Sequence, residues 1–69
     1  MNQDTVTRII NAQAKEQGYY TDADIMRAQD DIAESIILNN LPVGIAMPNF
    51  SSYLDKINYI VACGYKVAA

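Results

Sequence analysis

The sequence predicts an all-α fold, a small three-helix bundle in which residues 1–69 form one domain. Three segments carry apolar residues at three- and four-residue spacing, the pattern of amphipathic helices. Residues that cap helices stand before these segments. Glycine follows two of them, where helices commonly end. We therefore expect helices at about 4–17, 22–39 and 50–63, with an apolar loop at 41–48.

The first expected helix has one narrow apolar stripe. Asn2 or Asp4 can cap its start, and Gly18 can adopt the left-handed conformation that ends a helix. Only residues 18–21 lead to the next helix, so the two should be antiparallel or steeply crossed neighbours. The stripe runs through Val6, Ile9, Ile10, Gln13 and Ala14.

The second expected helix is the longest and should organise the core. Thr21 and Asp24 have the spacing of a capping box. Tyr20 and Ile25 have the spacing of a hydrophobic staple across the same helix start. We expect Leu38 to be buried with the isoleucines near the C-terminal end. The apolar face comprises Ile25, Ala28, Ile32, Ala33, Ile36 and Ile37.

The loop at 41–48, LPVGIAMP, is uncharged, and two prolines, Pro42 and Pro48, stand near its ends. Its apolar side chains fall on alternate positions, which suits a short extended strand or a loop over the open end of the helical pair. We favour a lid over the core, because so small a domain needs the buried area. A docking surface is the alternative. The alternating residues are Leu41, Val43, Ile45 and Met47.

The last segment has two interpretations. As a helix it begins at Asn49 or at Ser52, the latter with Asp55 three residues on, and it ends at Gly64. Its stripe would contain Phe50, Leu54, Ile57 and Val61, widened by Tyr53 and Ile60. The alternative is an α+β fold with a C-terminal hairpin around Cys63-Gly64. Cysteine does not relieve positive φ at the first turn position, so we favour the helix.

Composition excludes several partners and compartments. The net charge is −3 with five scattered basic residues, which argues against nucleic acid, because phosphate contacts need clustered Lys and Arg. The polar N-terminus lacks the features of a signal peptide, and no apolar run is long enough for a membrane span. One free cysteine suits a reducing compartment. We expect a cytoplasmic protein without membrane association.

Catalysis is the least expected function. The chain has no histidine, the commonest general base and zinc ligand. We interpret Cys63 as a small buried apolar residue. Asp30 and Glu34 could belong to a cation site, but Arg27 can compensate nearby carboxylates on one solvated face. We therefore predict no catalytic residues, no metal and no cofactor.

The surplus of apolar and tyrosine side chains favours a small non-catalytic protein-interaction module, an inhibitor, adaptor or assembly factor. Proteins of this kind are common among phage and mobile-element products. We also expect self-association as a two-fold dimer through the last helix and residues 41–48, because a short chain cannot enclose all its apolar residues. The candidate contacts are Val43, Ile45, Met47, Phe50, Tyr53, Ile57 and Tyr59.

Two other functions stay open. A homo-oligomeric bundle could hold a small ligand between subunits, with tyrosines and Arg8 or Arg27 as its contacts. A helix-turn-helix regulator is the weaker alternative, because about nine apolar residues would replace the tight turn and only Lys56 could contact phosphate.

Overall fold

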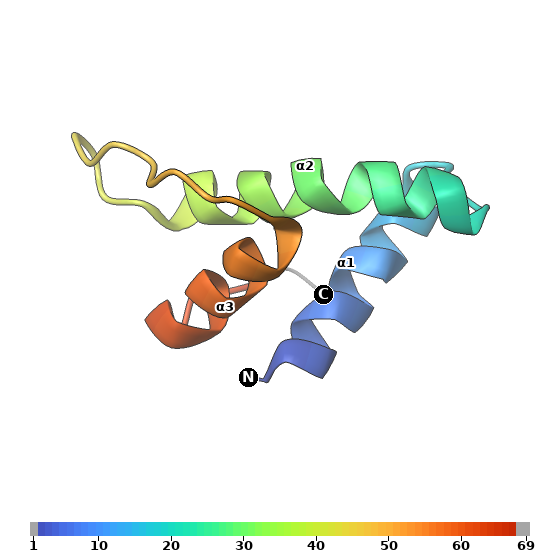
Figure 1. The fold of residues 1–69 in the computed structure, drawn as a ribbon, viewed down its shortest axis with the longest axis horizontal. Coiled ribbons are helices and arrows are strands. Elements are labelled where there is room, and N and C mark those ends of the chain that lie inside the picture. Colours follow the sequence, from blue (N-terminus) through green and yellow to red (C-terminus); the bar gives the residue numbers. More distant parts are fainter. Residues whose placement is uncertain (1, 68–69) are drawn as a thin grey trace.

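Three helices make up the computed structural model, which describes residues 2–67 (Figure 1). They are α1 (Gln3–Glu16), α2 (Asp22–Asn40) and α3 (Tyr53–Cys63). Each helix packs against the other two, so the predicted all-α three-helix bundle is confirmed. The alternative hairpin at the C-terminal end is wrong, because residues 2–67 contain no strand.

A side-chain cap begins each helix. In all three, an oxygen of the N-cap side chain accepts a hydrogen bond from the backbone N–H three residues on. The pairs are Asn2 with Thr5 at 2.9 Å, Thr21 with Asp24 at 3.1 Å, and Ser52 with Asp55 at 3.2 Å. The last pair confirms the predicted cap at Ser52, so α3 begins at Tyr53, and the alternative start at about 50 is wrong.

Left-handed glycines end α1 and α3, as predicted. Gly18 has φ 98° and Gly64 has φ 66°. After α3, the Tyr65 N–H donates to the Ile60 carbonyl at 3.2 Å. This is the hydrogen bond of a Schellman motif that spans five residues along the chain. α2 ends differently, because Leu41 precedes Pro42 and takes an extended conformation.

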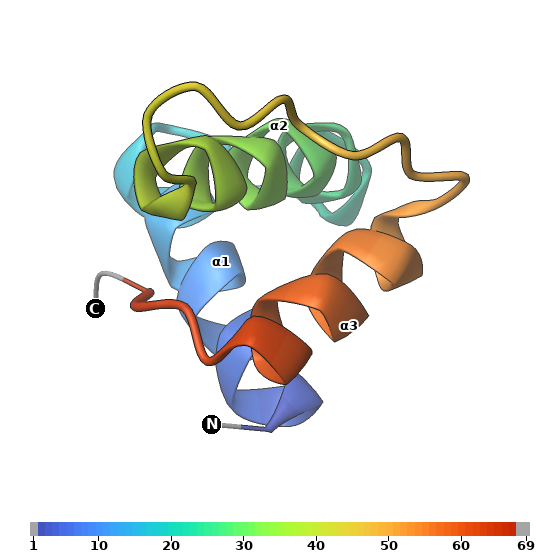
Figure 2. The ribbon, with the colours of Figure 1, turned by 90° about the vertical axis from the view of Figure 1, so that its left-hand side faces the viewer.

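The core lies where the three helices meet (Figure 2). Its residues come from the predicted faces of α1 and α2, from the inner side of α3, and from residues 65–67 after α3, which we call the tail. They are Val6, Ile10, Ala14, Ile25, Ala28, Ile32, Ala33, Ile36, Ile37, Ile57, Ile60 and Val67. Val67, in the tail, was not among the core residues expected from the sequence. Val67 reaches the core because the tail turns back toward α1 and α2.

Four side chains expected to be covered are exposed instead. Leu38 and Leu54 are 53% and 56% exposed. Tyr20 is 74% exposed, so the predicted staple buries little of its ring. Cys63 is also exposed, which corrects its assignment as a buried residue.

Candidate functional site

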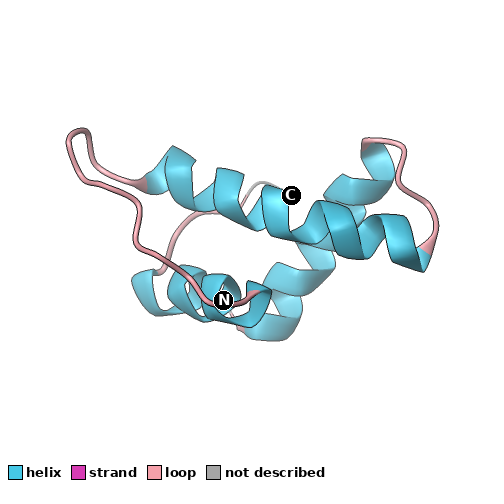
Figure 3. Ribbon diagram, turned by 45° about the horizontal axis from the view of Figure 1, so that its top comes forward, coloured by secondary structure: helices cyan, strands magenta, loops and turns pink. Residues whose placement is uncertain are grey.

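The loop at 41–48 extends beyond the end of α2 (Figure 3). It forms a turn in which the Ile45 N–H donates to the Pro42 carbonyl at 3.2 Å and Gly44 has φ 87°. Neither the predicted strand nor a complete lid forms. Leu41 and Met47 pack against the core, so the two ends of the loop are anchored.

The tip of this loop presents apolar side chains to solvent. Val43 is 104% exposed and Ile45 is 58% exposed. The two interpretations of this segment, a lid over the core and a docking surface, therefore apply to different residues of it. Its ends cover the core, and its tip, which we define as residues 43–45, is available for contact.

Three aromatic rings pack together around α3. Phe50 precedes the helix, Tyr59 lies within it and Tyr65 follows it. The Phe50 and Tyr59 ring centroids are 5.3 Å apart, and those of Tyr59 and Tyr65 are 5.7 Å apart, both edge-to-face. The Tyr65 hydroxyl donates to the Tyr59 hydroxyl at 3.5 Å. This hydrogen bond, followed by burial, raises the pKa of Tyr65 above its usual range. Phe50 and Tyr59 are therefore half-buried in contacts within the chain.

The remaining candidate contacts on α3 face inward. Ile57 is 1% exposed and belongs to the core, so it is not accessible to a partner. The Tyr53 hydroxyl is buried beside Thr7 without a hydrogen bond of good geometry. Burial raises the pKa of Tyr53, while Thr7 opposes the change and the charge of Asp30 adds to it. Of the seven predicted contacts, Val43 and Ile45 are the freely exposed ones.

Lys56 provides the counter-charge for the acidic residues of α2. Its ammonium lies 3.0 Å from Asp30 and 3.5 Å from Glu34, although the whole residue is only 8% exposed. Burial lowers the pKa of Lys56, but the hydrogen bonds and charges of the two carboxylates outweigh this and raise it. Arg27 contacts Asp24 at 3.9 Å, one of the nearby carboxylates that it was predicted to compensate. The carboxylates of Asp30, Asp31 and Glu34 lie within 4.8 Å of one another, with this ammonium beside them.

A groove of about 750 Å³ lies between α1, α2 and the tail. Sequence reasoning missed it, because its walls come from three separate segments. Buried aliphatic residues form its floor, and the other lining residues carry carboxamide and hydroxyl groups, one carboxylate and one ammonium. The lining residues are Gln13, Gln17, Tyr19, Ala28, Asp31, Ile32, Ser35, Ile36, Asn39, Asn40, Lys66 and Val67.

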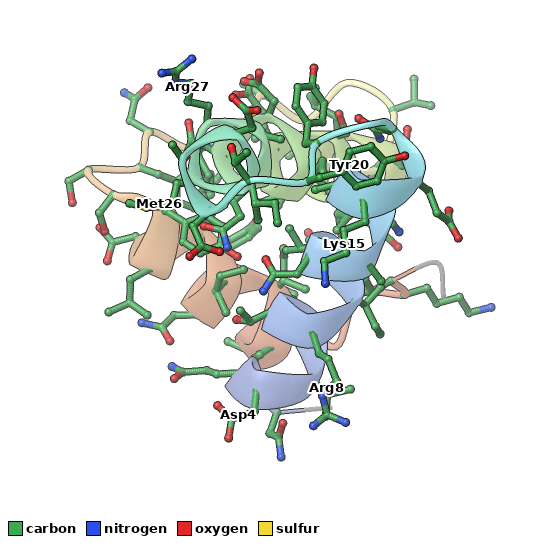
Figure 4. All side chains as sticks on the ribbon, turned by 90° about the vertical axis from the view of Figure 1, so that its right-hand side faces the viewer. Asp4, Arg8, Lys15, Tyr20, Met26 and Arg27 are labelled. Atoms are coloured by element: carbon green, nitrogen blue, oxygen red, sulfur yellow. The ribbon has the colours of Figure 1, made fainter. Side chains whose placement is uncertain are left out.

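The two arginines suggested as ligand contacts do not line this groove. Figure 4 shows Arg8 near the start of α1 and Arg27 on the outer side of α2, both pointing outward. The tyrosine at the groove is Tyr19. For a helix-turn-helix regulator, residues 41–52 replace the usual three- or four-residue turn, and Lys56 is already paired with carboxylates.

No helix among residues 2–67 is both long enough and apolar enough to span a bilayer. The chain matches no protein-family model, and no curated protein or solved structure is detectably similar to it.

Proposed function

We propose that this protein is a small non-catalytic interaction module, an inhibitor, adaptor or assembly factor, that binds a partner protein through the loop tip. The observation that carries the proposal is the exposure of Val43 and Ile45. Two neighbouring aliphatic side chains in an uncharged segment offer apolar area that a partner can bury. Charged residues are depleted at the cores of protein interfaces, and residues 41–48 have none.

The anchoring of the loop supports the same function. Leu41 and Met47 pack against the core on either side of the tip. Pro42 and Pro48 restrict the backbone within and beside the segment. A tip held in this way loses less conformational freedom on binding than a free loop would, which favours affinity. We further propose a cytoplasmic location, because a reducing compartment preserves an exposed thiol such as Cys63.

The groove supports a second candidate function, the binding of a small ligand within a homo-oligomeric bundle. Its volume falls within the roughly 300–1,000 Å³ of ligand sites, and it combines an apolar floor with a few polar groups. We rank it second, because Tyr19 is the one predicted kind of contact among the lining residues, and neither Arg8 nor Arg27 lines the groove.

The primary proposal is tested by affinity capture from host extract with chemical cross-linking. The tagged wild type is compared with Val43→Asp and with Leu54→Asp, a control that places the same charge on another exposed aliphatic residue. A protein retained by the wild type and the control but lost with Val43→Asp supports the module. If Val43→Asp captures the same protein as the wild type, the proposal is contradicted. It is also contradicted if nothing is captured and the chain is a monomer.

A further inference from the structure

The groove leaves part of the core open to solvent. Ile32 and Ile36 on its floor keep 6% and 7% exposure, whereas Ile37 on the same helix is fully buried. Val67, at its edge, keeps 9%. These residues offer an apolar floor that an aliphatic side chain can cover. Around them, Ser35 and Asn39 supply polar groups that can donate and accept hydrogen bonds.

One edge of the groove already binds a non-helical backbone. The Asn40 side chain donates to the Lys66 carbonyl at 3.0 Å and accepts from the Lys66 N–H at 3.3 Å. The next side chain, Val67, is buried against the core. A carboxamide paired with the N–H and the C=O of one residue, followed by a buried aliphatic residue, is thus the binding mode that this face displays. The groove continues directly from this contact, because Lys66 and Val67 line it.

The side chains and backbone of the loop tip match the chemical groups that line the groove. Residues 43–45 place Val43 and Ile45 on either side of Gly44, in a segment without charge. Among the described residues, the main-chain N–H groups of Val43 and Gly44 have no backbone partner, so they are free to bond to carboxamides. A docked tip would therefore bury aliphatic side chains and satisfy its own backbone.

The loop does not reach the groove of its own chain. Met47 and Phe50 line a small depression with Glu34 and Lys56, on the α3 side of α2. The groove lies on the α1 side, and no residue of 41–52 lines it. The loop and the groove are therefore available together on one molecule.

We propose that the loop tip of a second copy of this chain docks in the groove, and that a two-fold pair exchanges its loops reciprocally. This rests on the proposed function and names the partner as the chain itself. In a two-fold pair, the loop of each chain would enter the groove of the other, so two equivalent contacts form at once. The exchange replaces the dimer through α3 that the sequence suggested, because Ile57 is buried within the chain.

The test combines a loop variant with a groove variant. Val43→Asp places a charge on the tip, and Ser35→Glu places a charge of the same sign on the groove wall. Leu54→Asp and Ala12→Glu are the matched controls on exposed helix positions away from both surfaces. Native mass spectrometry and sedimentation equilibrium measure the dimer, and circular dichroism confirms that each variant is folded.

Each variant alone loses both contacts of the pair, so its dimer dissociation constant should rise by at least about tenfold, while the controls match the wild type. An equimolar mixture keeps one native contact, between the loop of the Ser35→Glu chain and the groove of the Val43→Asp chain. It should form mixed dimers more tightly than either variant forms its own. Both introduced charges are negative, so they cannot form an ion pair at the contact where the altered loop meets the altered groove.

Three results would overturn the exchange: a monomeric wild type at micromolar concentration, variants that dimerise like the wild type, or a mixture no tighter than its components. If the wild type is monomeric but the capture of another protein still depends on Val43, the exchange fails and the interaction module stands. If both assays are negative, both proposals fail.

Discussion

Asn40 and Lys66, 26 positions apart, are joined by two hydrogen bonds between the Asn40 carboxamide and the Lys66 main chain. The same side chain donates to the Ile36 carbonyl at 2.8 Å, within α2. One residue thus ties the C-terminal turn of α2 to the tail. The following residue, Val67, then closes the core beside the groove.

Replacing Asn40 by alanine should lower the free energy of unfolding by about 1–2 kcal/mol, because each lost hydrogen bond contributes about 0.5–1.5 kcal/mol and the site is partly exposed. Urea denaturation measures the change. Asn39→Ala is the matched control, since its side chain is exposed at the next position. Equal unfolding midpoints for the two variants would show that the tail is held by Val67 alone.

The start of α2 depends on the Thr21 hydroxyl. Thr21→Ala should cost about 1 kcal/mol of stability, because the Asp24 N–H loses its acceptor. Thr21→Ser keeps an oxygen in place and should stay close to the wild type. Thermal and urea unfolding of both variants test this prediction. A stable Thr21→Ala protein would mean that packing alone fixes the helix start.

Lys56 should make stability fall at alkaline pH. Because its pKa is raised in the folded state, its contribution is fully present below the ordinary lysine value of 10.5 and is lost as pH rises through the folded value. Lys56→Met removes this contribution, so the variant should lose less stability across the same range. Tyr53 and Tyr65 also have raised pKa values and shift stability in the same direction, but they are present in both proteins. Urea midpoints below and above pH 10.5 give the comparison, and parallel curves would remove Lys56 as a cause.

Cys63→Ala should change stability by less than about 0.5 kcal/mol, because the residue is exposed and fills no core space. A thiol reagent should modify the folded protein nearly as fast as a denatured sample. Slow modification of the native chain, relieved by denaturant, would return Cys63 to the interior.

The helices were predictable because their signals are local. Thr21 and Ser52 cap within one turn, and Gly18 and Gly64 each relieve a single left-handed position. Boundaries and core faces follow from such spacing. Periodicity shows which way a side chain points but not how far the neighbouring helices cover it, and for this reason Leu38 and Leu54 were misplaced.

The candidate site was predictable only in part. An uncharged segment between prolines marked Val43 and Ile45 as unusual, and both proved exposed. The groove and the Asn40–Lys66 contact depend on residues brought together from distant segments, which no local pattern encodes. The burial of Lys56 likewise depends on carboxylates of another helix.

The central claim, that the loop tip contacts another protein surface, is tested most directly by a photo-cross-linking amino acid at position 43. Irradiation of the folded protein, followed by peptide mapping, identifies what the tip touches. The same probe at position 54 serves as the control. We predict an intermolecular product from position 43, joined to the α2 or tail residues that line the groove of a second copy. A product on a different protein would keep the interaction module and remove the loop exchange. Absence of any intermolecular product at position 43, in host extract and in the concentrated pure protein, would contradict the account.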